Sequence, residues 1–281
     1  MYSTQFQQQY HDPRFNRYEP RADPFPEQPK TDQYPDDPNK EYSPIERSLR
    51  INFTRKVFGI AAMQIFITGL FVHFLTSHKL FFKILYFIPG TVTLAGFVSL
   101  ITSLALGFFG SISRNVPLNY ILLSIFTAAE SYCLGYIAVQ FDRDAVVMAM
   151  YLTAAVVAAL TVYAMRSKTE ITYYGGLLVL LALGTGALSF INWFTRFSFF
   201  DSLLFFGGCV MSGLYFIYDV KLLMGRDRFS LTLDDYIRGA MHLYIDVVRI
   251  FINILQIIAA KEKEKEREKE EERERQQRRY R

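Results

Sequence analysis

Residues 86–109 read YFIPGTVTLAGFVSLITSLALGFF, a run of 24 residues without Asp, Glu, Lys or Arg. A helix of that length rises about 36 Å, which is enough to cross the roughly 30 Å hydrocarbon layer of a bilayer. Open β-strands are not viable in that layer, because lipid cannot satisfy the backbone groups along their edges. The run therefore predicts a membrane-spanning helix.

Further apolar runs of similar length predict a bundle around it. The seven predicted spans cover residues 57–76, 86–109, 118–139, 144–165, 174–193, 199–224 and 237–260. The loops between them are short, which favours antiparallel neighbours, and their small residues favour close helix approach. The predicted fold is an all-α polytopic membrane protein, a bundle of seven helices. The last span carries Arg238, His242, Asp246 and Arg249, so it is expected either to cross or to re-enter.

Two polar segments of different character enclose the predicted bundle, residues 51–260. Residues 1–50 hold eight of the ten prolines, which prevents a long helix and predicts an extended or disordered N-terminal arm. Residues 261–281 hold ten Lys or Arg and eight Glu, a composition that favours a charged helical tail continuing from the last span. The mean hydropathy of +0.13 therefore averages over unlike parts.

The bulk composition argues against several classes of protein. A net charge of +4, with both signs in the tails, gives no indication of a nucleic-acid partner. The two cysteines, Cys133 and Cys209, lie in apolar runs, which argues against a disulfide framework and against a cysteine metal site. We find no phosphate-binding loop, zinc-protease motif or nucleophile elbow. We therefore expect no enzyme activity, no cofactor and no resident metal.

Loop charges bear on orientation. Nine Lys or Arg flank the spans on the side of the N-terminal arm and four lie on the other side, so that side is expected to be cytosolic or matrix-facing. If residues 237–260 cross, the charged tail emerges on the opposite side. If they re-enter, both tails share a side.

Ionisable residues inside spans are costly, so they are candidate functional groups. The candidates for pH sensing or an ion path are Glu130, Asp219, His242, Asp246 and Arg249. Two carboxyl groups brought together at depth share a proton, which is the chemistry of a pH-sensitive latch. Spacing alone also allows a plainer arrangement, in which Asp219 lies at the interface and Asp246 pairs with Arg249 one helical turn away.

Several stretches together resemble the transmembrane Bax inhibitor motif family, and its lifeguard or Golgi anti-apoptotic branch in particular. The resemblance covers residues 47–260. It is carried by FTRKVFGIAAMQIFITG (53–69), RNVPLNYILLSIFTAAESY (114–132), LTVYAMRSKTEITYYGG (160–176), IYDVKLLMG (217–225) and DDYIRGAMHLYIDVVRIFINILQII (234–258). A glutamate at the position of Glu130 is shared with that branch.

The resemblance implies a Bax-inhibitor-like bundle in which Asp219 and Asp246 form a pH-sensitive pair linked to calcium leak and to the regulation of apoptosis. It also implies a Golgi or endoplasmic-reticulum location, although some members are mitochondrial. Relatives commonly read LYLDIINLF where this chain reads LYIDVVRIF, so Arg249 replaces an asparagine. A fixed cation there should keep Asp246 ionised and oppose the passage of a divalent cation.

Two hypotheses about function therefore stand side by side. In the first, the protein is a pH-sensitive calcium leak with a regulatory role. In the second, it is a non-catalytic accessory subunit of a large membrane complex, for example in the mitochondrial inner membrane. In the second case the partners are proteins that bind the N-terminal arm and the charged C-terminal tail. In both cases the bilayer itself is a partner.

Overall fold

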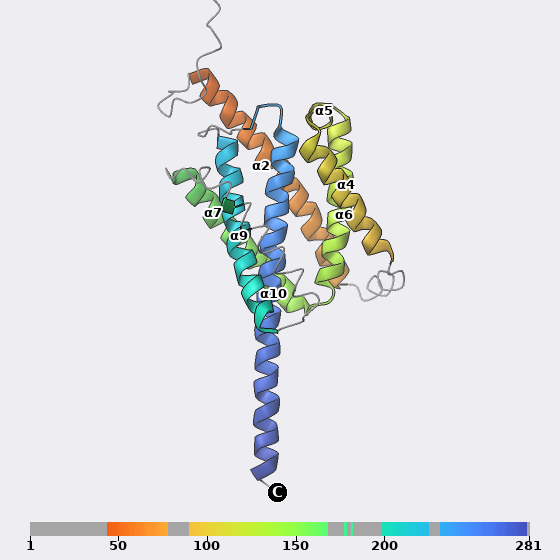
Figure 1. The fold of residues 1–281 in the computed structure, drawn as a ribbon, viewed down its shortest axis with the longest axis vertical. Coiled ribbons are helices and arrows are strands. Elements are labelled where there is room, and N and C mark those ends of the chain that lie inside the picture. Colours follow the sequence, from red (N-terminus) through yellow and green to blue (C-terminus); the bar gives the residue numbers. More distant parts are fainter. Residues whose placement is uncertain are drawn as a thin grey trace, which may run out of the picture. The chain divides into compact units, whose positions relative to one another are not determined.

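The computed structural model describes residues 44–77, 90–167, 177–178, 181, 198–224 and 231–279, and side chains in the 198–224 stretch from Leu204 onward. These residues form helices α2 (Pro44–Ser77), α4 (Gly90–Phe108), α5 (Gly110–Arg114), α6 (Leu118–Ala138), α7 (Arg143–Arg166), α9 (Ser198–Met224) and α10 (Tyr236–Arg279) (Figure 1). No strand occurs among them. Six of the helices are long and apolar enough to cross a membrane. The predicted all-α polytopic bundle is therefore confirmed.

The predicted spans that fall on described residues match these helices closely. The span predicted at 174–193 lies almost wholly outside the described residues. Helix α2 begins at Pro44, inside the predicted arm, because proline fits the first turn of a helix without losing a hydrogen bond. The short helix α5 was not predicted.

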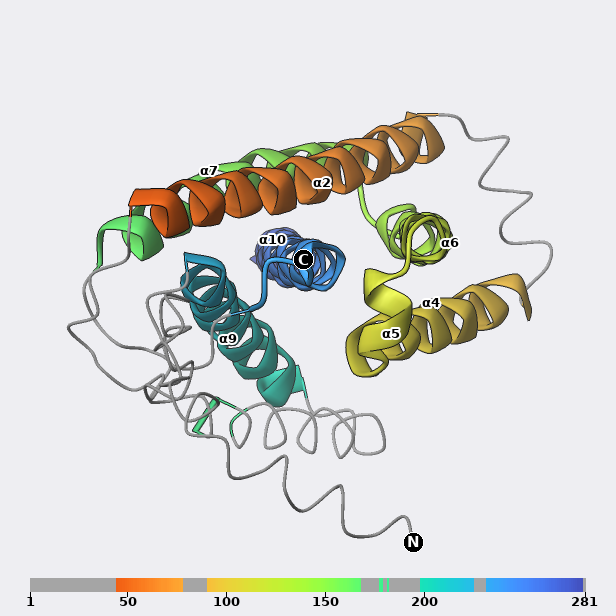
Figure 2. The same ribbon diagram turned by 90° about the horizontal axis from the view of Figure 1, so that it is seen from above.

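Helix α10 is the central element of the bundle. Seen from above, it lies between α2 and α7 on one side and α9 on another, and it packs against all three (Figure 2). Most of its side chains between Ile237 and Leu255 are buried, and several of them, including Tyr244 and Ile250, are fully enclosed. Each of the other long described helices packs against α10 or against a helix that contacts α10.

The same helix settles how residues 237–260 run. Helix α10 continues without a break from Tyr236 to Arg279, so the segment does not turn back on itself. Its residues from Lys261 to Arg279 are all exposed. Arg50, near the start of α2, donates to the backbone oxygen of Leu231, just before α10, so these two helices begin at the same end. The charged tail leaves the bundle at the other end (Figure 1).

Close packing of α9 on α10 depends on a glycine. A Cβ atom on Gly208 would lie 2.8 Å from Oδ1 of Asn253 in α10, whereas a Cβ on the neighbouring Gly207 would meet nothing within 4 Å. Small residues at such contacts let two helices approach in a membrane. Gly208 is therefore a packing residue, and Gly207 is not.

We predict that Gly208→Leu destabilises the protein, because the new side chain overlaps Asn253 and forces α9 away from α10. Overpacking of this kind costs about 1–3 kcal/mol. The measurement is the thermal unfolding of the detergent-purified protein, with Gly207→Leu as the matched control. Equal melting temperatures for the two variants would contradict the assignment.

Candidate functional site

Two carboxyl groups meet between α9 and α10. Asp219 lies near the end of α9, and Asp246 lies nearly three turns into α10, where its residue is only 4% exposed. The two carboxyl groups lie close enough for each to act on the other electrostatically. Oδ2 of Asp246 is buried and finds no hydrogen-bond partner among the described residues. A contact between two carboxyl groups requires a shared proton, because two buried like charges repel strongly.

Two basic side chains of α10 flank the pair. Nδ1 of His242 lies 3.8 Å from Oδ2 of Asp219. At this distance the two side chains form an ion pair only if the imidazole is protonated. Arg249 is exposed, and its charge acts on both carboxyl groups. His242, Asp246 and Arg249 follow one another at spacings of four and three residues, so all three lie on the face of α10 toward α9. The site thus has two acidic and two basic groups.

The alternative pairing within α10 does not occur. Asp246 and Arg249 are one turn apart, yet the structure contains no ion pair between these two described residues within 4.0 Å. Asp219 is also not at the surface, since its side chain is 16% exposed. Arg249 therefore sits beside the carboxyl pair without neutralising either member by direct contact.

Glu130 is not part of this site. It lies on α6, where the hydroxyl of Ser99 in α4 donates to its Oε2. The neighbouring contacts also join these two helices, with Thr91 bonded to Tyr132 and Cys133 close to the backbone oxygen of Val92. Glu130 therefore belongs to the contact between α4 and α6.

A second polar cluster, which the sequence analysis missed, lies between α2, α6 and α10. Nε2 of Gln64 donates to Thr127 across 2.7 Å, and Thr68 is bonded to both Ser131 and Tyr244. Gln64 and Thr68 are four residues apart, as are Thr127 and Ser131, so each pair shares one helix face. This repeated four-residue spacing of polar residues within apolar spans could have predicted the cluster. The sequence analysis considered only ionisable residues as candidates.

Arg114, Thr232 and Asp235 form a cluster of ionic and polar contacts at the start of α10, which we call the clasp. The guanidinium of Arg114 in α5 donates from Nε to Oδ1 of Asp235 at 3.0 Å and from Nη2 to Oδ2 at 3.1 Å. Thr232 also donates to this carboxylate. Burial raises the pKa of the Asp235 carboxyl, but the hydrogen bonds from Arg114 and Thr232, with the charges of Arg114 and Arg238, outweigh burial. The pKa is lowered from the ordinary value of 3.8.

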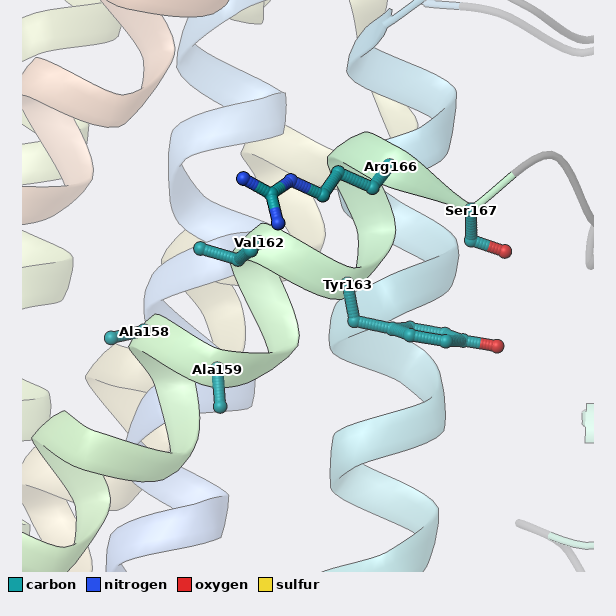
Figure 3. Close-up of a pocket in the computed structure, with 6 residues that line it drawn as sticks. All are labelled: Ala158, Ala159, Val162, Tyr163, Arg166 and Ser167. Carbon is teal, nitrogen blue, oxygen red and sulfur yellow. The ribbon is translucent and has the colours of Figure 1, made fainter.

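A shallow hollow lies elsewhere on the described surface. It is lined by six residues at the end of α7, Ala158, Ala159, Val162, Tyr163, Arg166 and Ser167 (Figure 3). All come from one helix end, and the side chains of Arg166 and Tyr163 point in different directions (Figure 3). Across the described residues, no three His, Cys, Asp or Glu side chains gather as a metal site.

Comparison with known proteins agrees with this architecture. Residues 50–263 match the profile of a family described as inhibitor of apoptosis-promoting Bax1. The chain is 29% identical to human protein lifeguard 3 over 220 residues, which covers 76% of this chain and 70% of that protein. It is 31% identical to Bax inhibitor 1 of Schizosaccharomyces pombe over 216 residues, covering 75% of this chain and 77% of the relative.

The lowered pKa of Asp235 predicts how the clasp responds to acid. Its stabilising contribution is complete above the pKa of the unfolded chain, about 3.9, and is lost as the pH falls through the lower folded value. Asp235→Asn should therefore lower the melting temperature at neutral pH, and by less at about pH 3, where part of the contribution of the carboxylate has been lost. Thermal unfolding at the two pH values measures this, with the exposed Asp142→Asn as control. A deficit of equal size at both pH values would refute the prediction.

Proposed function

Because the chain belongs to the family of inhibitors of apoptosis-promoting Bax1, we propose that this multi-pass membrane protein is a pH-sensitive cation leak. In this proposal calcium is the conducted ion, and the leak regulates cell death. The observation that carries the proposal is the contact between Asp219 and Asp246, buried between α9 and α10. The protein is proposed to act as a conductor and not as an enzyme.

The chemistry of the pair supports this role. While the two carboxyl groups share a proton, their hydrogen bond ties α9 to α10. Loss of that proton leaves two like charges in contact, which repel each other and expose oxygen atoms of the kind that calcium prefers. Oδ2 of Asp246 already lacks a partner among the described residues, so it is available to a passing cation.

Arg249 acts as a brake in this proposal. Its guanidinium is close enough to influence both carboxyl groups, and a fixed positive charge beside an ion path opposes a divalent cation. It forms no ion pair with Asp246, so the carboxyl pair persists beside it. The leak is therefore expected to be slow, and not absent.

We predict that Asp219→Asn and Asp246→Asn each abolish the pH dependence of calcium flux, because an amide does not titrate. The measurement is dye-reported calcium entry into liposomes that contain the purified protein, compared at acidic and alkaline pH. Asp144→Asn, at the exposed start of α7, is the matched control. A pH profile that survives in either site variant would overturn the assignment of the pair.

We further predict that Arg249→Asn raises calcium flux several-fold, because it removes the opposing charge while keeping a polar side chain. Arg166→Asn, at the end of α7, controls for the general loss of a positive charge. If neither the wild-type protein nor Arg249→Asn conducts calcium, the leak proposal fails.

The charged C-terminal part of α10 supports a second candidate function, that of an accessory subunit. The last nineteen residues of α10, Lys261–Arg279, form an exposed helix that continues beyond the bundle. A projecting charged helix suits docking to another protein, and the protein would then be an accessory subunit of a membrane complex. The compartment proposed with the leak is the Golgi or endoplasmic reticulum, and with the accessory role it is the mitochondrial inner membrane.

Truncation after Ala260 distinguishes this second role. We expect any stable partner to be lost from the protein extracted in mild detergent, while calcium flux in liposomes stays unchanged. Exchange of Glu271 and Arg275, which reverses one ion pair of the tail, tests for a defined docking face. Identical co-purifying proteins with and without the tail would exclude docking through it.

A further inference from the structure

A void of about 180 Å³ lies inside the bundle, away from the carboxyl pair. Its floor is the face of α10 that carries Val247, Val248 and Phe251. Its walls come from α2 and α7, and Leu134 of α6 also lines it. For comparison, an engineered cavity of about 150 Å³ binds benzene. The space is therefore large enough for the end of a hydrocarbon chain.

Hydrogen-bond accounting shows that the wall offers no donor to water. Ser131 donates its hydroxyl hydrogen to the backbone oxygen of Thr127. Thr68 must then donate to Ser131, and Tyr244 must donate to Thr68.

The remaining hydroxyl in the wall, that of Thr153, donates to the backbone oxygen of Ala149. The rest of the lining is apolar. A buried water needs two to four polar partners, so this void suits hydrocarbon and not water.

The void opens toward the bilayer between α2 and α7. Both helices rest on α10 but touch each other little. At the opening, Ala154 of α7 is exposed and Gly69 of α2 is partly exposed. The surface on either side is apolar and faces lipid, with Leu70 54% and Tyr151 75% exposed. The void is thus continuous with the lipid-facing surface.

We propose that this void is a binding site for the acyl chain of a bilayer lipid, which enters between α2 and α7 and lies on α10. Three observations agree on that occupant: the apolar lining, the committed hydroxyl hydrogens and the continuity with the lipid-facing surface. The chain end contacts Val247 and Val248, which are 7% and 5% exposed and otherwise inaccessible from the bilayer. The proposal does not depend on ion conduction.

The test uses the full-length protein in liposomes made with a phosphatidylcholine that carries a photoactivatable diazirine near the end of one acyl chain. After irradiation, peptide mass spectrometry locates the adducts. We expect adducts on Val247 and Val248 in addition to those on lipid-facing residues. Ala154→Phe, which blocks the opening, should reduce the floor adducts several-fold and leave the lipid-facing adducts unchanged.

Two further variants make the outcome decisive. Gly69→Leu blocks the opening from the other wall, where a Cβ already lies 3.4 Å from Cε of Met150, and should have the same effect. Leu100→Phe, on the exposed face of α4, should change nothing. Adducts confined to lipid-facing residues in the wild type would overturn the proposal. Floor adducts that persist in both blocking variants, each shown to be folded by its melting temperature, would also overturn it.

Discussion

Every polar group inside this bundle has to find its partner within the protein, because the surrounding hydrocarbon offers none. The described helices meet this constraint first through their own backbones and then through hydroxyl groups that bond one turn back. Such bonds to the carbonyl four residues earlier are made by Thr102, Thr127, Ser131, Thr153, Thr161 and Ser212. The few polar atoms left over are therefore informative, and one of them is Oδ2 of Asp246.

The central position of α10 brings several of these polar and apolar contacts onto a single helix. Because α10 packs against α2, α7 and α9, most of its bundle-embedded surface contacts protein, and its faces can carry different chemistry. One face places Asp246 beside Asp219, and the opposite face carries both the bond between Tyr244 and Thr68 and the floor of the apolar void. Because these faces belong to one rigid helix, a displacement of α10 at one of them is felt at the others. This explains why ionisable residues are tolerated in the last span and are rare in the preceding ones.

The sequence predicts the fold well because the length of an apolar run and the length of a spanning helix have the same physical cause. It predicts the site less completely. Spacing shows that Asp246 and Arg249 share a face, but it does not show where a long, flexible arginine side chain ends. The structure leaves these two unpaired and places Asp246 beside Asp219 instead. The cluster of Gln64, Thr127, Thr68, Ser131 and Tyr244 is missed for another reason, since neutral polar residues leave no mark on a charge count.

Orientation in the membrane follows from the crossing of α10 more than from the loops. The spans expected from the sequence put nine Lys or Arg of the loops on the side of the N-terminal arm and four on the other. Once α10 crosses, the ten Lys or Arg of the tail join the side that has four, and the positive-inside rule then favours the reverse orientation. Glu residues do little to cancel this effect, although Glu271 and Glu274 pair with arginines in the tail. The orientation that the positive-inside rule favours therefore depends on the charges of the C-terminal tail more than on those of the loops.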